Sequence, residues 1–251
     1  MIRDLLTAVA FLTRLPVARA FTVDAKQVAR SQLWFPLVGA LVGAIQAAVF
    51  WLVGSDLPPL VTAVLIVALD AWLTGAMHYD GLADTADGFG GGLTDDDVLR
   101  IMRDHAIGSY GAVAVVLAIA LKAAAIASFA GLARAIPALI AAPALGRWSA
   151  VLLSATQPYA RPISDDHPRS VGSPTRFVGR TQLIVATITT LIIAGLCGLW
   201  RGGLALLLVA AFSSFWAWRC RRRIGGVTGD TLGAAIEASA CLVLLVFAVR
   251  A

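Results

Sequence analysis

This chain has few charged residues, and acidic residues are especially scarce. Only 15 of its 251 residues are Asp or Glu and charged residues make up 14%, whereas apolar residues make up 59%. The mean hydropathy is strongly positive at +0.83. Soluble domains carry about 25% charged residues. The composition therefore excludes an ordinary soluble domain and indicates an integral membrane protein.

Asparagine is absent altogether, which removes N-glycosylation acceptors and Asn-based metal ligands from consideration. The three cysteines, Cys197, Cys220 and Cys241, lack metal-ligand spacing and lie in or beside apolar runs. They are interpreted as small apolar residues or inert thiols. Neither a repeat period nor a long flexible linker is present, so residues 1–251 are predicted to form a single membrane domain.

Apolar runs long enough to cross a bilayer dominate the chain. A hydrocarbon core about 30 Å thick needs roughly 20 helical residues. Seven runs reach or approach this length, which predicts an all-α, polytopic helical bundle with about seven transmembrane helices. The sixth run is the shortest, so we expect it to tilt less or to be partly re-entrant. The runs are 34–53, 59–77, 109–132, 135–155, 183–200, 203–218 and 232–249.

Basic residues predict the orientation of these helices. If the N-terminus is cytoplasmic, most of the 20 Lys and Arg residues fall on cytoplasmic segments, and only Arg134, Arg201 and Arg250 lie outside. Residues 1–33 then form an N-terminal cytoplasmic or interfacial segment with a helix ending at Pro16. A cleaved signal peptide is disfavoured because Asp4 interrupts its basic region.

Three aspartates gather just after the second run, in HYDGLADTADG (78–88). On a helix, Asp80, Asp84 and Asp87 point from one face within about 60°. No Lys or Arg lies between Met77 and Leu99 to neutralise them, which disfavours the alternative of a solvated acidic face. We therefore expect the three carboxylates to bind Mg²⁺, with phosphate oxygens of a substrate completing its coordination.

The rest of the cytoplasmic segment 78–108 carries weaker signals. The glycines of GFGGG, Gly88 to Gly92, either expose amides to phosphate or simply end the helix. Thr94 and the three aspartates that follow it predict a helix N-cap. Beyond it, Arg103 is a candidate phosphate ligand, and Asp104 either binds metal or orients that arginine. A plain surface salt bridge is the alternative for this pair.

A second constellation, GGVTGDTLGAAIE (225–237), leads from the cytoplasmic segment 219–231 into the last apolar run. Asp230 and Glu237 are seven residues apart and share a helix face. Glu237 lies about 10 Å deeper, where a carboxylate is costly unless it is paired or bound to a ligand. The glycines before this helix make its N-terminus a natural anion site.

Three further charged residues, Asp70, Lys122 and Arg147, fall inside the predicted spans. Alone, each costs about 2.5 to 3.5 kcal/mol at a helix centre, so we expect them to face the interior and compensate one another. Contact with an anionic substrate is favoured for the two basic residues. The only histidines, His78, His105 and His167, are interpreted as lying outside the site.

Several motifs occur in an order that resembles the cobalamin synthase family, which is to say adenosylcobinamide-GDP ribazoletransferases. They extend over nearly the whole chain, and the acidic motif and the TGDTLGAAIE segment are the most specific. The motifs are FLTRLPV (11–17), FPLVGALVG (35–43), HYDGLADTADG (78–88), IMRDHAIGSYG (101–111) and GGVTGDTLGAAIE (225–237).

The resemblance implies a Mg²⁺-dependent enzyme of the bacterial cytoplasmic (inner) membrane that joins adenosylcobinamide-GDP to α-ribazole or its 5′-phosphate and releases GMP. Besides the bilayer and these substrates, late cobalamin-pathway enzymes and a second copy of the chain are possible partners, and no nucleic acid is expected. Asp104 and Asp230 are the two candidates to accept the hydroxyl proton. By the resemblance, Asp80, Asp84, Asp87, Asp104 and Asp230 are catalytic, and Arg103, Lys122, Arg147, Thr231 and Glu237 bind substrate. Asp70 matches no motif position and is interpreted as structural.

Two other interpretations remain open at this stage. CDP-alcohol phosphotransferases and intramembrane prenyltransferases also place spaced aspartates at helix ends to hold Mg²⁺ and a diphosphate. A transporter would instead use the intramembrane charges as an ion or substrate path, but it would show related halves with broken helices. No such pairing is evident.

Overall fold

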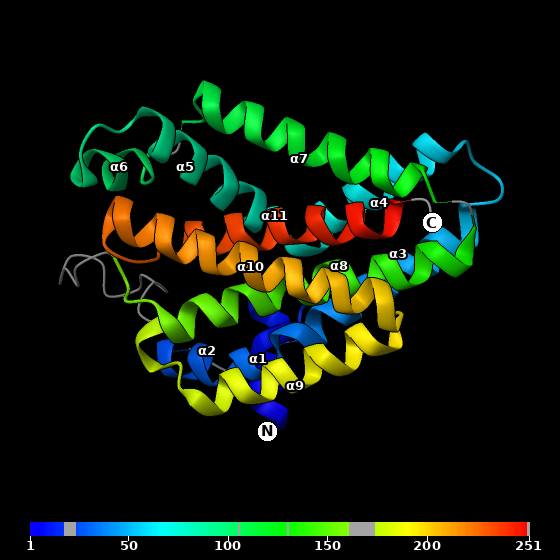
Figure 1. Cartoon of the computed structure of the whole chain (residues 1–251), viewed down its shortest axis with the longest axis horizontal. Coiled ribbons are helices and arrows are strands. Elements are labelled where there is room, and N and C mark those ends of the chain that lie inside the picture. Colours follow the sequence, from blue (N-terminus) through cyan, green and yellow to red (C-terminus); the bar gives the residue numbers. More distant parts are fainter. Residues whose placement is uncertain (18–23, 105, 130, 161–173, 250–251) are drawn as a thin grey trace.

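Helices account for nearly all of the chain that the computed structural model describes, which is residues 1–17, 24–104, 106–129, 131–160 and 174–249 (Figure 1). Within these ranges the only extended pairing is one parallel bridge between Tyr159 and Val227. The elements are α1 (Ile2–Leu12), α2 (Ala25–Ser31), η1 (Gln32–Trp34), α3 (Phe35–Val53), α4 (Pro59–Thr74), α5 (Met77–Gly91), α6 (Asp95–Ile101), α7 (Ser109–Ala127), α8 (Leu132–Thr156), η2 (Pro174–Phe177), α9 (Arg180–Leu196), α10 (Leu199–Ile224) and α11 (Gly229–Ala248).

Helix lengths confirm a multi-pass membrane bundle. Five helical stretches are long and apolar enough to cross a bilayer, and the bent pair α4 and α5 brings the number to six. Helix α9, with 17 residues, is apolar but shorter. Five or six spans among the described residues are roughly consistent with the predicted number of about seven. The bounds of α3, α7, α8 and α11 also lie within a few residues of the predicted runs, apart from the earlier end of α7.

The sixth run lies within α10, which is the longest helix in the described chain with 26 residues, so the re-entrant alternative was wrong, whereas the smaller tilt stays a prediction. Its apolar part is short, but the helix continues through the basic stretch that ends at Arg223. Hydropathy registers only the apolar part of a helix, whereas arginine is itself a good helix former. Helix α10 therefore carries its positive charges as a helical extension beyond the apolar run.

The second predicted run breaks where α4 meets α5. Gly75 and Ala76 both adopt left-handed backbone conformations, with φ of 65° and 58°. The two helices consequently differ in direction by 91°. The backbone amide of Arg14, just after α1, donates to the carbonyl of Leu73 at 2.7 Å and so braces the end of α4. Helix α5 leaves the direction of the bundle at this break and carries the acidic motif across one end of it (Figure 1).

Helices α3, α8 and α11 make up much of the packed interior (Figure 1). Gly39 and Gly43 on α3 lie directly against the backbone carbonyls of Pro143 and Leu139 on α8. A side chain at either glycine would collide with the neighbouring helix. The GxxxG spacing in this chain therefore permits close helix packing within one molecule.

This contact predicts that Gly43→Ala destabilises the protein by about 1–3 kcal/mol, because the added methyl group must displace the backbone of α8. Thermal unfolding of the purified protein in detergent measures the effect. Gly203→Ala is the matched control, since a methyl group at Gly203 on α10 meets nothing within 4 Å. Equal unfolding temperatures for the two variants would contradict the close packing.

Candidate active site

Helices α5 and α11 cross closely at the end of the bundle where the acidic motif lies. A Cβ atom built on Gly81 would lie 2.8 Å from the backbone carbonyl oxygen of Asp230, so only glycine allows this approach. The crossing brings Asp80 and Asp230 to the wall of one cavity of about 400 Å³. Two acidic residues 150 positions apart in the sequence thus meet at a single site, as the sequence motifs led us to expect.

Asp84 and Asp87 lie further along the same helix, and both are partly buried. The carboxylate of Asp87 accepts hydrogen bonds from the backbone amides of Gly108 at 2.7 Å and Gly111 at 2.9 Å. These amides belong to the start of α7, where the helix dipole favours negative charge. Asp87 therefore ties α5 to α7, which is a positioning role that its expected role in metal binding did not include.

The chemistry and the number of the carboxylates near the crossing determine whether they fit Mg²⁺. Among the described residues, no group of three or more His, Cys, Asp or Glu side chains has an arrangement that would hold a metal ion. Mg²⁺ usually binds one or two carboxylates and takes its remaining ligands from water and substrate phosphate. Asp80 and Asp84, one helical turn apart on α5, fit that pattern as hard oxygen donors, and Asp230 lies across the crossing.

Of the two roles expected for the glycines of the acidic motif, ending the helix is confirmed for the last two, because α5 ends at Gly91 and Gly92 is its C-cap. The helix continues through Gly88 and Gly90, so the amides of these two residues lie within helical backbone. Gly88 packs against Met102, and Gly90 packs against the ring of Tyr110 at the start of α7. These residues allow close contact between α5 and the segment that follows it, and a phosphate cradle finds no support here.

Helix α6 begins as predicted. The Thr94 hydroxyl accepts a hydrogen bond from the Asp97 amide at 3.2 Å, and hydrogen bonding with the Thr94 side chain lowers the pKa of the Asp97 carboxyl. After the helix, Asp104 accepts a hydrogen bond from the Ala106 amide at 3.1 Å, so its carboxylate shapes the local turn. Arg103 and Asp104 are both exposed and neither lines the 400 Å³ cavity.

The basic end of α10 contributes cations that the sequence analysis did not assign to the site. The Arg219 guanidinium lies over the ring of Phe89 on α5, 5.3 Å from its centroid, and Phe89 also stacks on Trp216. The Arg223 side chain donates to the backbone carbonyl of Gly92. Arg219 and Arg223 therefore place positive charge beside α5. In the sequence, the clustering of arginines at the end of one apolar run was the only signal of this arrangement.

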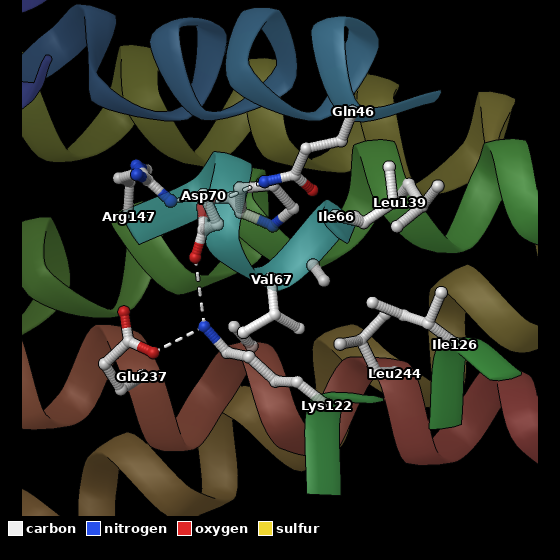
Figure 2. Close-up of a pocket in the computed structure, with 13 residues that line it drawn as sticks. Gln46, Ile66, Val67, Asp70, Lys122, Ile126, Leu139, Arg147, Glu237 and Leu244 are labelled. Carbon is white, nitrogen blue, oxygen red and sulfur yellow. Dashed lines mark hydrogen bonds and ion pairs between the residues drawn. The ribbon is translucent and has the colours of Figure 1, made fainter. Parts of the chain in front are cut away.

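A cluster of buried charged side chains lies deeper in the bundle (Figure 2). The Lys122 ammonium is 3.2 Å from a carboxylate oxygen of Asp70 and 2.5 Å from one of Glu237. It also donates to the Tyr79 hydroxyl at 3.1 Å, and the Gln46 amide donates to Asp70 at 2.8 Å. The expected compensation of intramembrane charges is confirmed for Asp70 and Lys122. Gln46 and Tyr79 were missed, although a glutamine inside an apolar run was a visible signal.

Arg147 completes the charge balance of this cluster. Its side chain is 2% exposed and donates to the backbone carbonyl of Pro143 at 3.3 Å. Within the described chain, its Nε and Nη2 atoms have no hydrogen-bond partner. Arg147 lines a cavity of about 20 Å³ together with the other three charged groups, which is room for a single water molecule. Two carboxylates and two cations are therefore enclosed together.

This enclosure bears on the three residues expected to bind substrate from within the spans. Lys122, Arg147 and Glu237 are each 4% exposed or less, and their cavity cannot admit a molecule the size of a nucleotide. Direct contact with substrate therefore finds no support in this structure. The same holds for Thr231, which is fully buried and whose hydroxyl accepts from the Thr228 amide at 2.8 Å in the N-terminal cap of α11.

His78 was expected to lie outside the site, but its position indicates otherwise. It is 2% exposed, lines the cavity that contains Asp80 and Asp230, and has its Nδ1 atom 3.9 Å from a carboxylate oxygen of Glu237. It thus lies between the cavity and the buried charge cluster. His105 and His167 fall outside the described residues.

The chain was compared with known proteins. The family model described as cobalamin-5-phosphate synthase matches residues 4–248. The chain belongs to this family. A curated relative from Shewanella frigidimarina (strain NCIMB 400), named adenosylcobinamide-GDP ribazoletransferase, is 37% identical over 252 residues, which cover 96% of this chain and 93% of the relative. The relative of the same name from Ralstonia nicotianae (strain ATCC BAA-1114 / GMI1000) is 39% identical over 251 residues, with 97% and 94% covered.

No solved structure matches this member of the cobalamin-5-phosphate synthase family. The family match confirms the resemblance that the sequence motifs indicated.

The buried cluster predicts that Lys122→Met lowers the free energy of unfolding by about 3–5 kcal/mol, because two buried carboxylates lose the cation bonded to them. Thermal unfolding in detergent measures the loss. Adding Asp70→Asn and Glu237→Gln to Lys122→Met should recover part of it. The chain's other lysine, Lys26, is exposed and provides the control Lys26→Met. Unfolding of Lys122→Met at the control's temperature would show that the cluster is not structural.

Proposed function

We propose that this chain transfers the adenosylcobinamide-phosphate part of adenosylcobinamide-GDP to α-ribazole or its 5′-phosphate, with release of GMP. One observation carries the proposal, namely the family match over residues 4–248. The curated relatives, which bear the name of this transferase, add to it. Both favour a transferase over the CDP-alcohol phosphotransferases, prenyltransferases and transporters that the sequence motifs had left open.

The arrangement of α5 and α11 supports phosphoryl-transfer chemistry at their crossing. A ribose hydroxyl oxygen forms a bond to the phosphorus nearest cobinamide, the bond from that phosphorus to the bridging oxygen breaks, and GMP leaves with the bridging oxygen. Such a reaction depends on positioning of the two substrates and on neutralisation of the phosphoryl oxygens. The chain's contribution is a fixed crossing with carboxylates on one side and the basic end of α10 near the end of α5.

The hydroxyl proton needs an acceptor near the cavity, and Asp230 fits better than Asp104. Asp230 lines the cavity at the first turn of α11, whereas Asp104, after α6, does not line it. A general base must lie within hydrogen-bonding reach of the proton that it removes. We therefore assign proton acceptance to Asp230.

Mg²⁺ is the proposed cofactor, and Asp80 and Asp84 are the proposed side chains to hold it. When bound, the ion would supply positive charge to the diphosphate oxygens. The exposed Arg103 guanidinium is proposed to add a bidentate phosphate contact. Asp87 contributes by fixing α5 against the start of α7.

The multi-pass bundle is proposed to lie in the bacterial inner membrane with this end facing the cytoplasm. Basic residues gather at this end, at Arg103 and along the final turns of α10, as the distribution of charge in membrane proteins favours. The nucleotide product and the water-soluble nucleoside acceptor are consistent with that side. Partner enzymes of the same pathway and self-association remain proposals by analogy with the family.

The transferase activity predicts GMP release that requires adenosylcobinamide-GDP, α-ribazole 5′-phosphate and Mg²⁺ together. Asp84→Asn should lower the rate by about a hundredfold or more, because charge stabilisation by a metal is worth several kcal/mol. Protein reconstituted in liposomes, with chromatographic measurement of GMP, provides the assay. The control Asp56→Asn alters an exposed aspartate between α3 and α4, at the other end of the bundle. Full activity of Asp84→Asn in the presence of a chelator would refute the metal assignment.

The choice of proton acceptor predicts different effects for two substitutions. Asp230→Asn should lower kcat by about a hundredfold or more while leaving the Mg²⁺ concentration for half-maximal rate little changed. Asp104→Asn should have a much smaller effect on kcat. Steady-state rates measured across a Mg²⁺ titration separate the two parameters. The reverse ranking of the two variants would transfer the role to Asp104.

A further inference from the structure

The 400 Å³ cavity beside Asp80 and Asp230 has the size of a small-molecule site. Its walls come from α1, α2, α3, α5, α8 and α11, together with η1 and η2. A nucleoside can enter such a volume. A corrinoid with its peripheral side chains is far larger and cannot. Of the two substrates, the nucleoside acceptor is therefore the one whose size fits this cavity.

Apolar side chains form most of the cavity wall. Phe11 and Phe35 stack on each other, with ring centroids 5.9 Å apart and planes at 17°. Val28, Leu232 and Ile236 are among the aliphatic residues that add to this apolar surface. Aromatic rings and branched aliphatic side chains are suitable neighbours for a flat heteroaromatic base. A purely ionic ligand such as free diphosphate would lose its hydration here without compensation.

Buried polar atoms without partners distinguish this cavity from an ordinary packing defect. Within the described chain, the amide oxygen of Gln32, the hydroxyls of Ser154 and Thr175, and both ring nitrogens of His78 have no hydrogen-bond partner. All four residues line the cavity and are at most 8% exposed. They come from η1, α8, η2 and α5, so no single local conformation explains them. Because buried polar groups are nearly always hydrogen-bonded in native proteins, these atoms point to a missing ligand.

The positions of the charged residues in the cavity wall indicate how a ligand is oriented there. Among the described lining residues, Asp80 and Asp230 are the only charged side chains, and neither Lys nor Arg is present. Asp80 is exposed, whereas His78 and Ser154 are buried. The carboxylates therefore lie toward the solvent side, and the neutral polar groups lie deeper. A ligand with a neutral, partly polar body and a reactive hydroxyl near the carboxylates matches this arrangement.

We propose that this cavity binds the nucleoside part of the acceptor, with its aromatic base between the apolar walls and its ribose toward Asp80 and Asp230. This inference rests on the proposed transferase function. Gln32, His78, Ser154 and Thr175 then determine acceptor specificity through hydrogen bonds to the base and sugar. The diphosphate and the corrinoid of the donor lie outside the cavity. A 5′-phosphate on the acceptor also projects out of it, so free and phosphorylated acceptors use the same contacts.

Ser154→Leu tests the inference, because the larger side chain occupies part of the cavity. We expect the KM for α-ribazole and for its 5′-phosphate to rise by about tenfold or more, equivalent to about 1.4 kcal/mol. The KM for adenosylcobinamide-GDP should change by less than about twofold. Equilibrium dialysis of α-ribazole against the protein without donor should show the same loss of affinity.

Two variants control for the size and the polarity of the substitution. Ser214→Leu makes the same change on the exposed side of α10, away from the cavity, and should leave both KM values unchanged. Ser154→Ala removes the hydroxyl without filling space and should weaken the acceptor by less than Ser154→Leu does. If Ser154→Leu does not fold, Gln32→Met serves in its place, with an expected three- to tenfold loss of acceptor affinity, about what one neutral hydrogen bond contributes.

The outcomes separate this inference from the function on which it rests. An active wild-type enzyme whose Ser154→Leu variant loses donor affinity and keeps acceptor affinity would overturn the inference, as would unchanged KM values for both. The wild-type protein could instead bind α-ribazole without releasing GMP, while the Ser154→Leu variant binds α-ribazole more weakly. That result would support the binding site and refute the transferase function.

Discussion

The ammonium group of Lys122, held between two carboxylates inside an apolar bundle, is the constraint on which the rest of this structure depends. A cation at this depth is tolerated only when opposite charges lie within bonding distance. Asp70 on α4 and Glu237 on α11 provide them. Gln46 on α3 and Arg147 on α8 border the same small cavity, so the requirement for neutrality connects five helices. Their relative heights, and therefore the height at which α11 emerges beside α5, are fixed by this one cluster.

Between the buried charge cluster and the acidic motif, the backbone conformation, and not the charge, determines the direction of α5. A non-glycine residue in a left-handed conformation costs about 1–2 kcal/mol, and Ala76 adopts one at the break between α4 and α5. The hydrogen bond from the Arg14 amide to Leu73 braces the same place. The break lets α5 run across the bundle end, so that its carboxylates meet α11 and do not continue in the direction of α4. The N-terminal helix thus supports the site from outside while also forming part of its wall.

Much of this arrangement was predictable from the sequence, and the failures have physical causes. The bounds of α3, α8 and α11 and the pairing of Asp70 with Lys122 follow from the cost of polar groups in hydrocarbon, which acts locally on each segment. The length of α10 did not follow, because hydropathy stops at Arg219 although the helix does not. The bond from Asp87 to the start of α7 also could not be predicted, since it depends on how two helices pack.

His78 shows a different limit on what the sequence alone can predict. A lone His beside a motif carries no signal of its own, and its importance appears only when Ser154, Gln32 and Thr175 are seen to line the same cavity from distant parts of the chain. Likewise, an acidic motif read along one helix suggested three equivalent carboxylates. Packing makes them unequal, because Asp87 is bonded to backbone amides while Asp80 is exposed.

The partners of Lys122 also order events during synthesis. Asp70 precedes the lysine by 52 residues, whereas Glu237 follows it by 115. At a ribosomal rate of roughly 5–20 residues per second, the second carboxylate is made on the order of ten seconds after the lysine. During that interval Asp70 is the counter-ion already available, so α4 and α7 form a neutral pair that can enter the bilayer together. The nascent chain reaches its final electrostatic state, and gains the second wall of the cavity beside Asp80 and Asp230, only when its last helix arrives.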